Sequence, residues 1–258
     1  DASRDLTAKL VKLVQAMQEI KAEEDSRVNS YEIFVNQKQT HIRNSRGVDV
    51  TFSGFDCEIE VVTNSRKDDH EIEIYKDLRF SDKSAEKIIA EVRGMFHTGR
   101  QRLNAVPTRQ NEHADVLLSG DAVGSFFQYF AMHTNASYQY MGVAKAKIGE
   151  AITGADADPL NIRLVPTLDG SAKNAPYDET GMPVAERVLF ENGICRSYWG
   201  SLQHAHYIGM KDTTSMNNMV VEGGSKTLDE LRSMPHIEIT DFSAFDMDAV
   251  SGTCGGEI

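Results

Sequence analysis

Two stretches of strictly alternating acidic and apolar residues constrain the fold of the N-terminal half more than any other feature. They read Glu58-Ile59-Glu60-Val61 and Glu71-Ile72-Glu73-Ile74. A period of two places the apolar side chains on one face of a strand and the carboxylates on the other. Such strands are typical of an antiparallel sheet with one buried and one solvated face, so a sheet buried on both faces is not expected here.

Amphipathic helices flank this predicted sheet. Apolar residues at helical spacing predict one helix from Leu6 to Ile20 and another from about Ser84 to Leu103, the second capped by Ser81 or Asp82. A polar break is expected at Asp25–Asn29 and a turn at Asn64–Asp69. The predicted strands between the helices are Tyr31–Val35, Thr40–Arg43, Val48–Phe52, Cys57–Val62 and Glu71–Tyr75.

The second half is richer in loops and has shorter elements. It is predicted to contain a strand at Ala114–Leu118, a helix from Asp121 to about His133, strands Val184–Glu191 and Ile194–Trp199 joined by an Asn-Gly turn, a capping box at Thr227–Glu230 and a strand at His236–Thr240. This order predicts an α+β fold with antiparallel or mixed sheets and a few helices. We expect two regions: a helix, meander and helix over 1–110, and a loop-rich β region over 111–258.

The charge balance of the chain limits the classes of partner that it is expected to bind. The chain has 258 residues, with 27 basic against 39 acidic ones and a net charge of −12. Such a surface repels phosphate backbones and anionic lipid, so neither nucleic acid nor a membrane is an expected partner. No stretch approaches the roughly 18 apolar residues of a membrane-spanning helix. The three cysteines (Cys57, Cys195 and Cys254) are far apart in sequence, which predicts reduced thiols in a cytoplasmic protein.

The residues alone do not predict a metal site or a known catalytic motif. His204 and His206 lie two apart in a predicted helix, a spacing that separates their side chains. Asp156 and Asp158 occupy a loop without the EF-hand pattern. The sequence also lacks HExxH, GxSxG, Walker and GxGxxG motifs.

Several blocks in order resemble the TldD/PmbA family, zinc peptidases that are also called modulators of DNA gyrase. The resemblance extends over nearly all 258 residues and implies a PmbA/TldD-like fold. The blocks are Ala175–Pro183 (APYDETGMP), Leu189–Gly193 (LFENG), Ser215–Gly224 (SMNNMVVEGG), Asp241–Ser243 with Ser251–Ile258 (SGTCGGEI), and His41–Gly47 upstream.

The resemblance also implies that the zinc site has been lost. In the TldD branch, an HExxxH helix supplies two zinc-binding histidines and a catalytic glutamate. In this chain the matching six residues run from Gln128 through Tyr129 to His133, so only His133 retains a suitable side chain. An amide is a poor zinc ligand and a phenol a poor base near neutral pH. Cys254 does not match the third, cysteine ligand. The resemblance therefore favours the PmbA (TldE) branch, with no catalytic residue, metal or cofactor in this chain and zinc only in an HExxxH-bearing partner.

For that branch, the resemblance implies a homo- or heterodimer with a TldD-type subunit that acts on unfolded or leader peptides. The candidate peptide-cleft residues are Asp178, Gly181, Asn217 and Asn218, which could equally be turn residues that define the fold. The candidate contributors to a subunit interface are Phe127, Met132 and Tyr138–Met141.

Two alternatives to this hypothesis stay open at this point. One is an active metallopeptidase with an unrecognised site, and the other is a stand-alone peptide-binding or scaffold protein. Family members also have a further N-terminal domain and further strands after the GGEI block. The sequence is therefore expected to be short at both ends.

Overall fold

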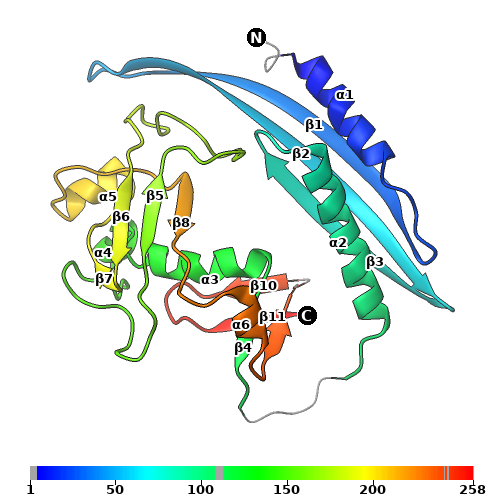
Figure 1. Cartoon of the computed structure of the whole chain (residues 1–258). Helices are drawn as coiled ribbons and strands as arrows, with labels where there is room; N and C mark the ends of the chain where they lie inside the picture. The colour runs from blue at the N-terminus through cyan, green and yellow to red at the C-terminus, as the bar shows by residue number, and fades with distance from the viewer. Residues whose placement is uncertain (1–4, 108–112, 241, 243, 258) are drawn as a thin grey trace. The chain divides into compact units, whose positions relative to one another are not determined.

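The chain folds into two compact units, each of which combines helices with antiparallel or mixed sheets (Figure 1). The computed structural model describes residues 5–107, 113–240, 242 and 244–257. Unit 1 comprises Asp1–Arg109 with Thr167–Asn174, and unit 2 comprises Gln110–Pro166 with Ala175–Ile258. The architecture confirms the predicted α+β class. The boundary expected between residues 110 and 111 lies outside the described residues, as do Asp241, Ser243 and Ile258 of the family-like blocks.

Unit 1 is a three-stranded antiparallel sheet, in the order β1-β2-β3, with both helices packed on one face (Figure 1). Cys57, Ile59 and Val61 on β2 are completely buried beneath the helices, whereas Glu58 and Glu60 point to the other face. The alternation of apolar and acidic residues in the sequence therefore matches the alternation of buried and more exposed side chains along β2. The elements of unit 1 are α1 (Leu6–Gln18), β1 (Ser26–Arg43), β2 (Asp49–Lys67), β3 (His70–Phe80) and α2 (Ala85–Leu103).

The strands of unit 1 are longer than the sequence predicted. The predicted strands Tyr31–Val35 and Thr40–Arg43 merge into β1, and Val48–Phe52 and Cys57–Val62 merge into β2. The two continuous strands pair from Ser26↔Ser65 to Arg43↔Asp49. Polar segments stay in the sheet because the partner strand, rather than water, satisfies their backbone groups. For the same reason the polar break predicted at Asp25–Asn29 is wrong, since β1 already begins at Ser26.

The N-terminal cap of α2 and the turn between β2 and β3 also differ from prediction. The α2 cap is Ser84, whose hydroxyl accepts a hydrogen bond from the Lys87 backbone N–H, rather than Ser81 or Asp82. The turn predicted at Asn64–Asp69 is confined to Asp68 and Asp69, with Asp68 at φ +53°, because β2 and β3 remain paired up to Lys67↔His70.

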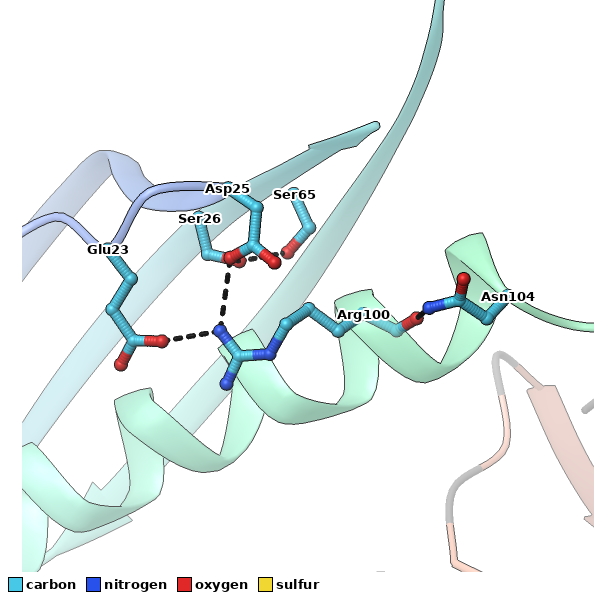
Figure 2. Close-up of polar contacts among 6 residues, drawn as sticks. All are labelled: Glu23, Asp25, Ser26, Ser65, Arg100 and Asn104. Atoms are coloured by element: carbon cyan, nitrogen blue, oxygen red, sulfur yellow. Dashed lines mark hydrogen bonds and ion pairs between the residues drawn. The ribbon is translucent and has the colours of Figure 1, made fainter. Parts of the chain in front are cut away.

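A polar cluster ties α2 to the start of β1 (Figure 2). The Arg100 guanidinium forms ion pairs with the carboxylates of Glu23 and Asp25, the second at 3.1 Å. The Ser26 hydroxyl donates to Asp25 at 2.9 Å and shares a hydrogen bond with Ser65 of β2 at 2.8 Å. These contacts fix the end of the α1–β1 connection against both the helix and the sheet.

Unit 2 is built around a four-stranded antiparallel sheet in the order β7-β6-β5-β8. A parallel pair, β4–β9, and an antiparallel hairpin, β10–β11, accompany it. The strands are β4 (Val116–Leu118), β5 (Ile162–Val165), β6 (Arg187–Glu191), β7 (Ile194–Cys195), β8 (Asn218–Val221), β9 (Ile237–Ile239), β10 (Ala244–Met247) and β11 (Cys254–Glu257). The helices are α3 (Asp121–Met132), α4 (Ala136–Met141), α5 (Leu202–Tyr207) and α6 (Leu228–Arg232).

The Asn-Gly turn and the capping box predicted for unit 2 are confirmed. Asn192 and Gly193 form the β6–β7 turn with φ values of +51° and +75°, and the Thr227–Glu230 capping box is present. The β7 strand is shorter than predicted. The chain leaves the sheet after Cys195, and the Trp199 backbone then pairs with the segment that joins α3 to α4.

Among the described helices, none has the length and apolar character needed to cross a bilayer.

The contact between α2 and β2 yields a stability prediction. A Cβ added at Gly99 would lie 2.3 Å from the Ser65 Oγ atom and 2.8 Å from its Cβ, whereas one added at Gly94 of the same helix meets nothing within 4 Å. We expect Gly99→Ala to lower the free energy of unfolding by about 1–3 kcal/mol through overpacking. Gly94→Ala should raise it by roughly 0.5–1 kcal/mol. Urea denaturation of both variants tests this; equal effects would contradict the packing argument.

Candidate functional site

Helix α3 carries the degenerate motif and follows β4 through a glycine bend. Gly120 has φ +69°, and a Cβ there would lie 2.8 Å from the Thr240 carbonyl oxygen, so only glycine fits without strain. Gln128 and Tyr129 line a pocket of about 320 Å³ together with Met132, Tyr138 and residues of β10. The strand, bend and helix therefore present the first two motif positions to an open pocket.

A lysine ammonium contacts Tyr129, the residue at the motif position where the resemblance places the catalytic glutamate. The Lys145 Nζ atom donates a hydrogen bond to the Tyr129 hydroxyl at 2.6 Å and another to the Ser251 carbonyl at 3.3 Å. The same atom lies 5.2 Å from the centre of the Tyr129 ring. A metal cation at this point would meet the positive charge of the ammonium, so the local electrostatics oppose metal binding.

His133, the remaining motif histidine, belongs to the core. Its side chain is completely buried, and its Nδ1 atom accepts a hydrogen bond from the Lys145 backbone N–H at 3.1 Å. That bond assigns the proton of the neutral ring to Nε2, for which no described residue is a hydrogen-bond partner. The Tyr129 ring packs edge-on against the imidazole, with centroids 4.5 Å apart. Burial, assisted by the charge of Lys145, lowers the pKa of His133.

The other side chains considered as ligands do not complete a site. Cys254 is exposed and lines a separate apolar groove of about 620 Å³ with Phe126, Phe127 and Phe245. In the part of the chain that the structure describes, no three His, Cys, Asp or Glu side chains are grouped closely enough to hold a metal ion. Gln128, Tyr129 and His133 therefore do not fit the zinc of the TldD branch.

The buried cysteines are not poised as nucleophiles. Burial raises the pKa of Cys195 to about 11, and it also raises the pKa of Cys57. The thiolate is the reactive form of cysteine. At neutral pH both groups therefore remain inert thiols inside their cores.

A second pocket, of about 430 Å³, brings together two of the four predicted cleft residues. Asp178 and Asn217 line it with Tyr177, Trp199 and Met216, whereas Gly181 and Asn218 are not among its lining residues. This pocket lies entirely within unit 2. Its lining is mostly polar, and Tyr177, Trp199 and Met216 are its aromatic and apolar members.

The Asp178 carboxylate is engaged in its own turn. Its Oδ1 atom accepts hydrogen bonds from the Thr180 N–H at 2.8 Å, the Thr180 hydroxyl at 2.7 Å and the Met182 N–H at 3.0 Å. Gly181 completes the turn with φ +82°. Asp178 therefore holds one wall of the pocket in shape, because its Oδ1 atom accepts these hydrogen bonds from its own turn.

The two asparagines hold neighbouring chain segments together. The Asn217 Nδ2 atom donates to the Ala175 carbonyl at 3.2 Å. Asn218 is only 5% exposed and donates to the carbonyls of Val165 and Pro166 at 3.5 and 3.4 Å. Asn217 thus lines the pocket and holds the segment at Ala175, whereas Asn218 is buried and holds β8 against the end of β5.

Sequence reasoning missed Lys145 and the pocket's aromatic residues. One signal for Lys145 was available, because residues 122–144 contain no Asp, Glu, Lys or Arg and Lys145 is the first charged residue after that run. Tyr177 and Trp199 had no comparable signal, since aromatic residues in loops are more often simply packed.

The burial of His133 predicts a pH dependence of stability. Its pKa is lower in the folded chain than the ordinary value of about 6.5 expected after unfolding, so the unfolded state takes up the proton first as the pH falls. The free energy of unfolding should therefore be highest above about pH 6.5 and decrease below it. His133→Asn should weaken this dependence between about pH 7.5 and pH 5.5, and the same change at exposed His70 is the control. Urea titrations at both pH values test this; an unchanged slope in His133→Asn would contradict it.

Comparisons with known proteins place this geometry in a family. Residues 111–258 match the family model for the PmbA/TldA metallopeptidase C-terminal domain. A search of curated proteins gives no significant match.

Three solved structures share the fold. The first is TldE from Thermococcus kodakarensis, with a TM-score of 0.73, 18% identity, and coverage of 97% of this chain and 60% of that one. The second is a proposed modulator of a DNA gyrase from Thermotoga maritima, with a TM-score of 0.71, 19% identity, and coverage of 96% and 60%. The third, also a proposed modulator of DNA gyrase, is from Bacteroides thetaiotaomicron, with a TM-score of 0.68, 17% identity, and coverage of 98% and 59%.

At these identities the structural likeness concerns the fold alone, and the chain spans about 60% of the length of those proteins. The family match, by contrast, includes more than half of the chain, with helix α3, both polar pockets and the closing β hairpin inside it. The chain therefore belongs to the PmbA/TldD family.

Proposed function

We propose that this chain is a non-catalytic, HExxxH-less member of the PmbA/TldD family that acts as the partner of a zinc-bearing, TldD-type subunit in a cytoplasmic peptidase assembly. The observation that carries the proposal is the contact between Lys145 and Tyr129. It puts an ammonium group against Tyr129, the residue at the motif position where an HExxxH-bearing relative has its glutamate. Gln128 and the buried His133 leave no alternative ligand pair on the same helix.

The peptide role assigned to this subunit is supported by two features. One is the pocket lined by Tyr177, Trp199 and Asn217, whose mostly polar lining offers hydrogen-bonding groups to a peptide backbone. The other is β1, which pairs only with β2 among the described strands and so has a free edge. An extended segment of an unfolded or leader peptide can add to such an edge through main-chain hydrogen bonds.

A stand-alone peptide-binding or scaffold protein is the second candidate. The pocket that contains Asp178 and Asn217 is formed within one chain, so peptide capture does not itself require a partner. An active metallopeptidase with its own site is less well supported, because the described residues lack a suitable group of ligands. Direct action on DNA is opposed by the net charge of −12.

Co-expression with an HExxxH-bearing relative separates the two candidates. The partner hypothesis predicts that the two proteins co-purify and that peptide cleavage, sensitive to chelator, occurs with the pair and not with this chain alone. Peptide binding by this chain without any association with the relative would instead favour the stand-alone alternative. Chelator-sensitive cleavage by this chain alone would contradict both.

Restoring the two lost motif residues tests whether more than the motif is missing. We expect the double variant Gln128→His, Tyr129→Glu to bind zinc weakly if at all and to cleave no peptide. The new carboxylate would form an ion pair with the Lys145 ammonium, and the His133 imidazole remains inside the core. Catalytic zinc sites normally use three protein ligands. Zinc titration followed by calorimetry checks the prediction, with Gln128→His alone as the control; tight stoichiometric binding with activity would refute it.

A further inference from the structure

The pocket of about 430 Å³ in unit 2, called here the Asp178 pocket, is lined by negative charge without a counter-charge. Asp178 and Glu179 are its charged members, and none of the described residues that line it is a lysine, an arginine or a histidine. Within the described chain, neither carboxylate forms an ion pair. The chain itself therefore leaves two negative charges at this pocket unneutralised.

Several hydrogen-bond donors of the Asp178 pocket are already used within the chain. The Trp199 indole N–H donates to the Ala131 carbonyl at 2.9 Å, so it serves the core of unit 2. The Asn217 amide nitrogen donates to a backbone carbonyl at 3.2 Å, and the Ser215 hydroxyl donates to the Asn217 Oδ1 atom at 3.4 Å. These groups are satisfied before any ligand arrives, so they offer little to a ligand that needs donors.

The carboxylates, by contrast, keep acceptor capacity. The hydrogen bonds that Thr180 and Met182 donate to Asp178 all reach its Oδ1 atom, which holds the carboxylate in place and leaves Oδ2 without a donor among the described residues. The exposed Glu179 carboxylate likewise accepts no hydrogen bond from a described residue. A ligand that matches this pocket must therefore supply both N–H donors and positive charge.

We infer that the Asp178 pocket binds a cationic amino or guanidino group of a peptide, which is either a lysine or arginine side chain or the terminal ammonium. This inference rests on the proposed peptide role and names the chemical class that the pocket selects. Tyr177 and Trp199 add aromatic rings to the lining, and aromatic faces attract cations. An acidic side chain would meet two carboxylates and no cation. An apolar side chain would displace water from the carboxylates without replacing its hydrogen bonds.

Calorimetric titration of the full chain with a set of peptides tests this selectivity. The peptides are short, acetylated and amidated at their ends, and identical except for a central lysine, arginine, methionine or glutamate. The lysine and arginine peptides should bind about tenfold more tightly than the methionine peptide, as expected for charge-assisted hydrogen bonds, and the glutamate peptide should bind most weakly. A methionine peptide with a free amino terminus distinguishes the two sources of the cation. It should match the lysine peptide only if the terminal ammonium is the group that is bound.

Neutralising the carboxylates locates the binding. Asp178→Asn should weaken binding of the lysine peptide about tenfold, and Glu179→Gln about threefold because its carboxylate is more exposed. Asparagine keeps the Oδ1 acceptor of the turn, and urea denaturation verifies that each variant is folded. Glu222→Gln is the matched control, at an exposed glutamate of unit 2 outside the pocket. It makes the same change in net charge and should leave binding unchanged, whereas attraction to the acidic chain as a whole would respond to all three substitutions.

Equal affinity for the lysine and methionine peptides would overturn the inference and leave the peptide role intact. An equal loss of affinity in the Asp178, Glu179 and Glu222 variants would also overturn it, because the cation would then respond only to overall charge. If no peptide binds, the inference and the peptide role of this pocket fail together. Co-purification with an HExxxH-bearing relative still tests the proposed subunit role separately.

Discussion

The imidazole of His133 lies wholly inside unit 2, and the geometry of the candidate site follows from that position. Its Nδ1 atom holds the backbone of Lys145, so the lysine side chain starts next to the end of α3 and reaches the Tyr129 hydroxyl. From there the ammonium contacts the Ser251 carbonyl near the closing hairpin. The buried ring thus links α3 to the segment after α4, and the Lys145 side chain extends that link to the C-terminal segment. Releasing it to bind a metal would remove this link and expose a gap in the core.

The fold of unit 1 could be predicted well because its signals are local and repeated. The alternation around Ile59 and Ile74 identified the buried face of the sheet, and the apolar stripe of α2 identified the helix that covers it. Strand lengths could not be predicted, because polar residues such as Gln37 remain in β1 only through pairing with Phe55 of β2. That pairing is a tertiary constraint, invisible to a pattern of single residues.

The candidate site was predictable only in part. The resemblance located Gln128, Tyr129 and His133 on one helix and identified the loop that contains Asp178. Burial of His133 and the reach of Lys145 over sixteen positions to Tyr129 depend on how the segment after α4 returns to the end of α3, so the sequence could not supply them. The roles of Gly181 and Asn218 in turn and sheet geometry likewise became evident only from their backbone angle and hydrogen bonds.

We propose that the motif helix of this PmbA/TldD-family chain does not hold zinc. The most direct test is elemental analysis of the full chain, purified without chelator from cells supplied with zinc. We expect far less than one zinc ion per chain, and no change in metal content when Lys145→Met removes the competing ammonium. A stoichiometric zinc ion that is lost in His133→Asn would contradict it, because the metal would then be bound by the histidine assigned here to the core.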